Sequence, residues 1–167
     1  MYAQIVQFAR SLRQLDHCLD KAIAYAASRK FDVNVLAGSR LAPDQYELAR
    51  QVQSACDSAK LAAGRLSGKE VPKHADTEKT IEELKARIAA VVRILDGFGE
   101  ADFSGSDDRQ VKLGWLPGKV LRGRDYLLEF AVPNFYFHIA MAYAILRHNG
   151  VDLGKTDYIA KLTTREA

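Results

Sequence analysis

Four long stretches of the chain carry apolar residues at three- and four-residue spacing, the pattern of an amphipathic helix. The pattern predicts helices over residues 2–28, 43–66 and 124–149, and a third helix in chain order from a cap at Asp76 or Thr77 to Gly97. Proline is favoured in the first turn of a helix and glycine just past its end, which supports these boundaries. The main elements of this chain are therefore helices that share one apolar core.

The segment 103–123 interrupts this pattern. Its apolar and polar residues alternate, and the turn sequence LPGK follows Trp115. Such a segment is typical of a short β-hairpin or an extended crossover. We therefore predict an all-α fold, a four-helix up-down bundle, with a long crossover that carries a short hairpin before the last helix. Residues 1–167 are expected to form one domain of this kind.

The composition of the chain argues against nucleic-acid binding and against membrane association. The chain has 167 residues, a formal net charge of +3 and no long basic run, so we expect no nucleic-acid binding. Neither a signal-peptide pattern nor an apolar run long enough for a membrane span is present, which predicts a cytoplasmic protein that binds no membrane. The cysteines, Cys18 and Cys56, fall on separate predicted helices and are expected to be buried free thiols.

Two polar residues stand on the apolar face of the last predicted helix. That face is formed by Leu127, Ala131, Asn134, His138, Ala142, Ile145 and Asn149. Because a buried amide or imidazole is costly without partners, Asn134 and His138 must be hydrogen-bonded or bound to a ligand. One interpretation is a metal site completed by a residue of the second helix. The other, which we favour, is a hydrogen-bond network with Gln53, because neutral amides are poor ligands for zinc or nickel.

The familiar catalytic motifs are absent from the sequence, including a glycine-rich phosphate loop, GxSxG and HExxH. A nucleophilic Cys56 would need a base beside it. His138 could serve as that base if the second and last helices are neighbours. The sequence leaves open whether the protein is an enzyme.

Two long segments, LAPDQYELARQVQSACDSAK and DYLLEF followed by VPNFYFHIAMAYAILRHNGVDLGK, resemble an uncharacterised bacterial family of unknown function. That family is placed in the DinB/YfiT-like superfamily of four-helix bundles, which includes metal- and thiol-dependent transferases and isomerases. Metal-binding members carry a histidine on the second helix and an HxxxH pair on the fourth. The resemblance assigns His138 to the second histidine of that pair, Asn134 to the first, and Gln53 to the helix-two ligand. It thus implies a degenerate metal pocket.

These observations give two hypotheses for function. The first is a small-molecule-binding or structural protein with a degenerate pocket at Gln53, Asn134 and His138. Under this hypothesis we expect no cofactor, and at most a weakly bound zinc or nickel ion at His138. The second is a metal- or thiol-dependent transferase or isomerase that uses His138 as a ligand or general base.

The last predicted helix also carries a second apolar stripe beside its inward face. The stripe consists of Tyr136, Phe137, Met141 and Ala144. The hairpin could cover only part of it, so we expect a symmetric homodimer that buries the rest.

Overall fold

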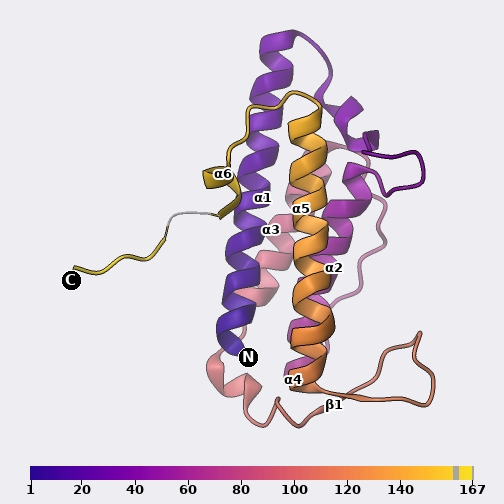
Figure 1. The fold of residues 1–167 in the computed structure, drawn as a ribbon, viewed down its shortest axis with the longest axis vertical. Helices are drawn as coiled ribbons and strands as arrows, with labels where there is room; N and C mark the ends of the chain where they lie inside the picture. The colour runs from indigo at the N-terminus through magenta and orange to yellow at the C-terminus, as the bar shows by residue number, and fades with distance from the viewer. Residues whose placement is uncertain (160–161, 167) are drawn as a thin grey trace.

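The structure, a computed structural model, describes residues 1–159 and 162–166 and is mostly helical. Its four long helices, α1 (Tyr2–Arg29), α2 (Leu48–Ser67), α3 (Ile81–Asp96) and α5 (Val132–His148), form a bundle (Figure 1). The shorter helical elements are η1 (Val33–Gly38), η2 (Glu100–Phe103), α4 (Gly123–Asp125), η3 (Tyr126–Ala131) and α6 (Lys155–Ile159). The prediction of an all-α four-helix bundle is confirmed.

The directions of the helices differ from the strictly alternating up-down order that we expected from the hydrophobic pattern. α1 and α5 run one way, and α2 and α3 lie side by side running the other way (Figure 1). α2 therefore packs between α5 and α3, diagonally opposite α1. The connection 68–80 has to return along the outside of the bundle before α3 can begin (Figure 1).

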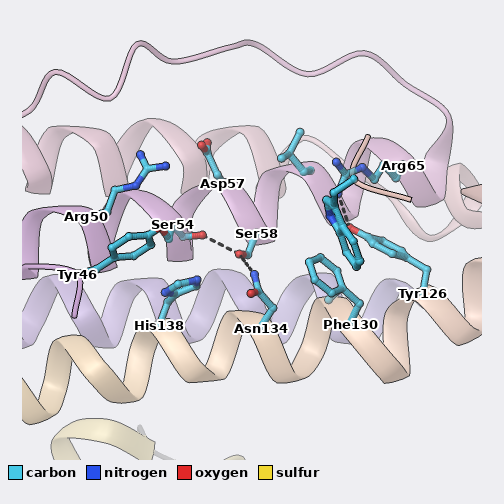
Figure 2. Close-up of a pocket in the computed structure, with 13 residues that line it drawn as sticks. Tyr46, Arg50, Ser54, Asp57, Ser58, Arg65, Tyr126, Phe130, Asn134 and His138 are labelled. Carbon is cyan, nitrogen blue, oxygen red and sulfur yellow. Dashed lines mark hydrogen bonds between the residues drawn. The ribbon is translucent and has the colours of Figure 1, made fainter. Parts of the chain in front are cut away.

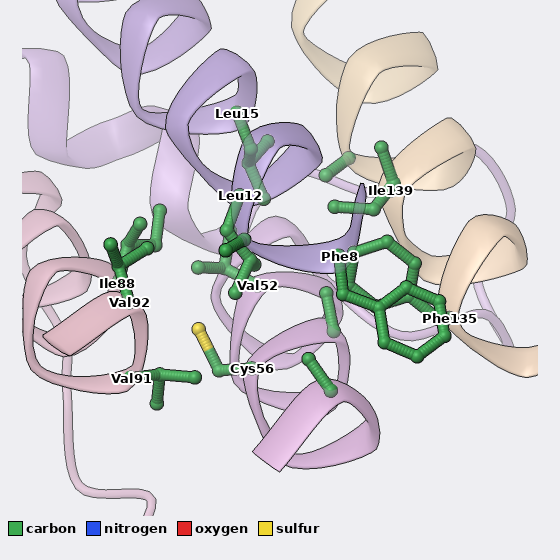
Figure 3. Packing of buried hydrophobic residues seen from close by; sticks show 14 of the residues in the cluster. Phe8, Leu12, Leu15, Val52, Cys56, Ile88, Val91, Val92, Phe135 and Ile139 are labelled. Atoms are coloured by element: carbon green, nitrogen blue, oxygen red, sulfur yellow. The ribbon is translucent and has the colours of Figure 1, made fainter. Parts of the chain in front are cut away.

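One continuous core fills the space between the helices (Figure 3). The inward face of α2 is fully buried: Leu48, Val52, Cys56, Ala59, Ala63 and Leu66. At the centre, the rings of Phe8 and Phe135 lie 4.3 Å apart and join α1 to α5. Cys18 and Cys56 are both buried and free, as predicted.

Two helices begin later than predicted. α2 starts at Leu48 and not at Pro43, because residues 42–45 form a turn in which Gln45 donates its backbone N–H to Ala42. α3 starts at Ile81, where Thr80 and Glu83 form a capping box. The acidic residues just before α3 make ion pairs instead of capping it.

The segment between α3 and α5 crosses the end of the bundle and contains the predicted hairpin. β1 (Gln110–Val111) pairs antiparallel with β2 (Leu121–Arg122), and the loop between them projects from the bundle (Figure 1). Trp115 in this loop is 61% exposed, and its ring lies 5.4 Å from that of Phe130. The hairpin therefore brings an aromatic side chain to the beginning of the last long helix.

The last helix contains a π-helical segment, η3, immediately before Pro133. The backbone N–H of Val132 bonds to the carbonyl of Leu127, five residues earlier. Pro133 has no N–H to donate, so the regular α-helical ladder could not continue unbroken through this turn. The helix is thus irregular immediately before Pro133, where it forms a π-helical turn.

The second apolar stripe of α5 is only partly covered. Tyr136 is half-buried, and its ring lies 6.2 Å from that of Phe8, whereas Phe137 is 51% exposed. Trp115 of the hairpin packs on Phe130 and not on this stripe. Among the described residues, no helix is both long enough and apolar enough to cross a bilayer.

Candidate functional site

A groove with a volume of about 440 Å³ lies between α2 and α5 (Figure 2). The groove is lined by Tyr46, Arg50, Ser54, Asp57, Ser58, Leu61, Arg65, Trp115, Tyr126, Phe130, Ala131, Asn134 and His138. The two helices run antiparallel here, so residues early in α2 lie opposite residues late in α5. The groove consequently has a polar half near His138 and an aromatic half near Tyr126.

Asn134 and His138 both line the groove, one turn apart on α5. Gln53 does not line it, which differs from the sequence-based assignment. The Gln53 amide donates to the Glu78 carboxylate at 3.1 Å, on the side of α2 that faces the connection 68–80. One residue turns an α-helix by about 100°, so the groove receives Ser54 and not Gln53.

His138 is buried and held in one orientation by Gln51. The Gln51 side chain donates its Nε2 hydrogen to the carbonyl of Tyr46 at 3.2 Å, so its Oε1 atom faces the imidazole. His138 Nδ1 must then be the protonated nitrogen, which donates to Gln51 Oε1 at 2.8 Å. The second nitrogen, Nε2, is left as an acceptor without a hydrogen bond to any described residue.

Burial lowers the pKa of His138 below its ordinary value, and the nearby Arg50 charge lowers it further. The imidazole is therefore neutral at neutral pH. A neutral, fixed imidazole with one free nitrogen can accept a hydrogen bond or a proton from a molecule in the groove.

Asn134 is oriented in the same way by its neighbour on α2. Ser58 uses its hydroxyl hydrogen in a bond to the carbonyl of Ser54 at 2.7 Å, so its oxygen can only accept from Asn134. Asn134 accordingly donates its Nδ2 hydrogen to Ser58 at 2.7 Å (Figure 2). Its Oδ1 atom has no protein donor in the described part of the chain and remains an acceptor beside the groove.

The other half of the groove is aromatic. The ring centroids of Trp115 and Phe130 lie 5.4 Å apart, and those of Tyr126 and Phe130 lie 6.0 Å apart. Tyr126 is almost fully buried, and Arg65 donates to its hydroxyl at 3.0 Å. Burial raises the pKa of Tyr126, so its phenol remains neutral. This end offers apolar faces together with one guanidinium group.

The charged groups of the groove differ in their pairing. Arg50 pairs with Asp76 at 2.6 Å, and Asp57 pairs with the buried Arg87 at 2.7 Å. Arg65 has no carboxylate partner among the described residues. Its contacts are the Tyr126 hydroxyl and the Tyr126 ring, 5.6 Å from the guanidinium carbon. Arg65 therefore brings a positive charge to the aromatic end, and no carboxylate of the described residues pairs with it.

The groups around His138 do not fit a tightly bound transition metal. One imidazole, one amide and two serine hydroxyls are weak donors for zinc or nickel compared with three imidazoles or thiolates. No set of three histidine, cysteine or acidic side chains among the described residues is arranged to hold a metal ion.

Cys56 does not form a catalytic pair with His138. Its thiol lies in the core near Val91 and Val52, on the side of α2 away from the groove (Figure 3). Burial raises its pKa to about 12, so the reactive thiolate is not available at neutral pH.

Sequence reasoning identified the α5 half of the groove and missed most of the α2 half. Gln51, Ser54, Ser58 and Arg65 were not singled out. A usable signal exists, because Arg50, Ser54 and Ser58 recur at four-residue spacing and form a polar stripe beside the apolar face of α2. Polar stripes of this kind usually face solvent, which is why spacing alone did not mark them.

Replacing His138 by alanine is expected to lower the free energy of unfolding by about 1–3 kcal/mol, because the buried Gln51 Oε1 atom would lose its donor. His148 is exposed in the last turn of the same helix, so His148→Ala is the matched control and should change stability much less. Urea unfolding followed by circular dichroism measures both. Equal effects of the two substitutions would contradict the structural role of the His138–Gln51 bond.

The same histidine should make stability depend on pH. The folded-state pKa of His138 lies below the ordinary value of 6.5, so the folded protein binds fewer protons than the unfolded chain near that pH. The free energy of unfolding should therefore decrease as the pH falls below 6.5 toward the folded-state pKa of His138. His74, whose pKa is also lowered by burial and then by Arg87, contributes in the same direction. His138→Ala should reduce the decline and leave the part due to His74.

Comparison with known proteins identifies a family and a similar solved structure. The family model described as a domain of unknown function, DUF1993, matches residues 1–159. A crystal structure of a DinB family member protein from Shewanella denitrificans is 47% identical, with a TM-score of 0.94. That similarity covers 98% of this chain and 93% of the other. No curated protein matches the chain.

Proposed function

We propose, from the premise that this chain belongs to the DUF1993 family and has a DinB-like fold, that it binds a small molecule in the α2–α5 groove without a metal ion. One observation carries the proposal. Asn134 and His138 are each fixed by an α2 side chain, and each still has an acceptor atom beside the groove that receives no hydrogen bond from the described residues. A few fixed polar groups among aromatic walls, in a space of this size, are characteristic of ligand sites.

The groove is expected to recognise its ligand by shape and hydrogen bonding. Fixing Asn134 and His138 in advance lowers the entropy lost on binding, because these side chains need not be ordered again. A buried acceptor left unpaired also disfavours molecules that bring no donor to it. The arrangement therefore favours selective binding over a purely structural role.

A second candidate is an enzyme in which His138 acts as general base. The specific observation in its favour is the fixed tautomer, since Gln51 holds Nδ1 and leaves the basic Nε2 nitrogen free. Such an enzyme would remove a proton from its ligand. The two functions are separated by incubating any identified ligand with the protein and looking for a chemical change that His138→Asn abolishes.

The proposal is tested by comparing wild type with a variant whose groove is filled. Ser54 is half-buried in the groove and its hydroxyl makes no hydrogen bond to a described residue, so Ser54→Phe should fill the groove at little structural cost. Ser28→Phe, exposed near the end of α1, is the matched control. In a thermal-shift screen of small metabolites, ligands should raise the Tm of wild type and of Ser28→Phe but not of Ser54→Phe. Ligands that stabilise all three proteins alike would contradict binding in the groove.

The metal content of the purified protein tests whether the groove works without a metal ion. Protein purified without a nickel column should contain well below one metal ion per chain after dialysis against chelator. Stoichiometric zinc, nickel or iron that survives this dialysis would overturn it and favour a metal-dependent enzyme.

We also propose a homodimer through the second stripe of α5. The exposed Phe137, with the half-buried Met141 and Ala144 on the same helix, supports this arrangement. Burying such a face between two copies related by a twofold axis would remove apolar area from water. Sedimentation equilibrium tests it, and a monomer at high micromolar concentration would argue against it.

A further inference from the structure

We infer that the ligand of the α2–α5 groove is a small aromatic anion with a hydrogen-bond donor at the end opposite its charge. The inference rests on the proposed function, because it names the class of molecule that the groove would bind. Three features carry it: an arginine without a carboxylate partner, an aromatic wall, and a pair of free acceptors.

Arg65 supplies the charge at one end. Each of the other arginines at the groove has acidic partners: Arg50 pairs with Asp76, and the neighbouring Arg87 contacts three carboxylates. Arg65 has none among the described residues, and only one of its five N–H groups is used, in the bond to Tyr126. A half-buried guanidinium with free donors binds a carboxylate or phosphate through two parallel hydrogen bonds.

The surroundings of Arg65 reinforce the sign of the expected charge. Arg65 also lines the adjoining hollow at the end of α2. That hollow contains Lys73 and Arg109, together with the acidic Glu70 and with Lys69, which pairs with Asp102 at 2.6 Å. The carboxyl end of α2 would by itself disfavour an anion, but Arg109 donates to the carbonyl of Leu66 there at 3.0 Å. The local field is therefore positive, and a cationic ligand would meet repulsion.

The middle of the groove is suited to an aromatic ring. Trp115 packs against Phe130 and remains 61% exposed, so a large apolar surface faces the opening of the groove. Leu61 of α2 lines the same stretch. Aromatic side chains favour offset or edge-on packing with another ring, and burying this exposed face would stabilise a planar ligand.

The other end accepts hydrogen bonds. Asn134 Oδ1 and His138 Nε2 both lack a donor among the described residues, so a ligand hydroxyl or N–H would satisfy either of them. Ser58, which bonds to Asn134, lies seven residues before Arg65, a separation of about 10 Å along α2. This length matches a single ring with a short acidic side chain on one side and a hydroxyl on the other.

The experiment uses the only tryptophan of the chain, Trp115, as a reporter at the groove. Four probes differ in one property each: 3-(4-hydroxyphenyl)propanoate, its neutral alcohol analogue, the amine tyramine, and 3-phenylpropanoate without the hydroxyl. The first should change Trp115 fluorescence and bind at least about tenfold more tightly than the alcohol or the amine, as expected from a charge-assisted bond. 3-Phenylpropanoate should bind more weakly than the hydroxylated acid.

Variants assign the effect to Arg65. Arg65→Gln should weaken binding of the hydroxylated acid about tenfold and leave the alcohol unchanged, and Arg65→Lys should give an intermediate affinity because it keeps the charge without the planar fork. Arg29 is a matched control, since its guanidinium also lies over a tyrosine ring, at 5.8 Å from that of Tyr25, but outside the groove. Arg29→Gln should bind all four probes like wild type. If Arg65→Gln does not fold, the Arg65→Lys variant and the probe comparison on wild type still decide the question.

The outcomes separate this inference from the proposed function. Equal or tighter binding of the alcohol or the amine, or acid binding unaffected by Arg65→Gln, would overturn the anionic class while groove binding stands. If no probe binds but other metabolites stabilise wild type and not Ser54→Phe, the aromatic anion is overturned alone. If neither test finds a ligand, both the aromatic-anion inference and the proposed function are overturned.

A competition experiment with phenyl phosphate distinguishes a carboxylate from a phosphate ligand. If phenyl phosphate displaces the hydroxylated acid at a lower concentration than 3-phenylpropanoate does, the result supports a phosphate-bearing ligand of the same class.

Discussion

Replacing Arg87 by alanine is expected to lower the free energy of unfolding by about 3–5 kcal/mol, one of the two largest effects we predict for this chain. The Arg87 side chain is completely buried, and it contacts Asp57 at 2.7 Å, Asp76 at 3.1 Å and Glu78 at 3.0 Å. Removing the guanidinium leaves Glu78 without a cation among the described residues and takes one of two cations from Asp57 and from Asp76. Net stabilities of natural domains are of the order of 5–15 kcal/mol, so the variant should be close to unfolding.

Urea unfolding at neutral pH measures this effect, with Arg13→Ala as the matched control. Arg13 also pairs with a carboxylate, Asp96, at 2.6 Å, but both side chains are about half exposed. Exposed pairs of this kind contribute about 0–1 kcal/mol. Similar losses in the two variants would mean that burial of the Arg87 cluster does not matter for stability.

Gly123→Ala is the second substitution with a large expected effect. A Cβ atom at this position would collide with the carbonyl oxygen of Ser106 and lie 3.1 Å from Leu66 Cδ2. Because the obstruction is backbone, the chain itself must move, at a cost of about 3 kcal/mol, the upper part of the range typical of overpacking. The strand β2 ends here, so the shift should also displace the hairpin and change the fluorescence of Trp115.

Gly114 in the same hairpin provides the control. A Cβ atom there would meet nothing within 4 Å, so Gly114→Ala should leave stability and Trp115 fluorescence close to wild type. Unfolding curves and emission spectra of the two variants test both expectations. If Gly123→Ala behaves like Gly114→Ala, the close packing of residue 123 on the backbone of residue 106 is not a constraint on the fold.

The hydrophobic pattern predicted the existence of the long helices well, because buried positions recur along a helix every three or four residues. It predicted their first residues less well. At Pro43 the sequence permits either a helix start or a turn, and the choice depends on a backbone bond from Leu48 to Ser39, nine residues earlier. The parallel course of α2 and α3 depends on the path of the connection 68–80, and a polar connection of that length fits more than one path.

For the groove, the sequence indicated Asn134 and His138 because polar residues on an apolar stripe violate a simple rule. Their partners follow no such rule. Gln51 and Gln53 lie two residues apart and therefore on nearly opposite sides of α2, and only the packing of α2 against α5 decides that Gln51 meets His138 while Gln53 meets Glu78. The burial of Arg87 likewise has no signal in the spacing of α3, because it depends on residues 76–78 of the returning connection.

The π-helical turn before Pro133 bears on how the groove could vary among related chains. A π turn accommodates one residue more than the α-helical turn it replaces, so it is equivalent to a single-residue insertion. Deleting Leu128, which is 59% exposed, would restore α-helical spacing and rotate Tyr126 by about 100° relative to Asn134. A lineage that gained or lost one residue in this segment would keep the bundle and exchange the aromatic lining of its groove. Length variation here is thus a route to new specificity that leaves the buried core unchanged.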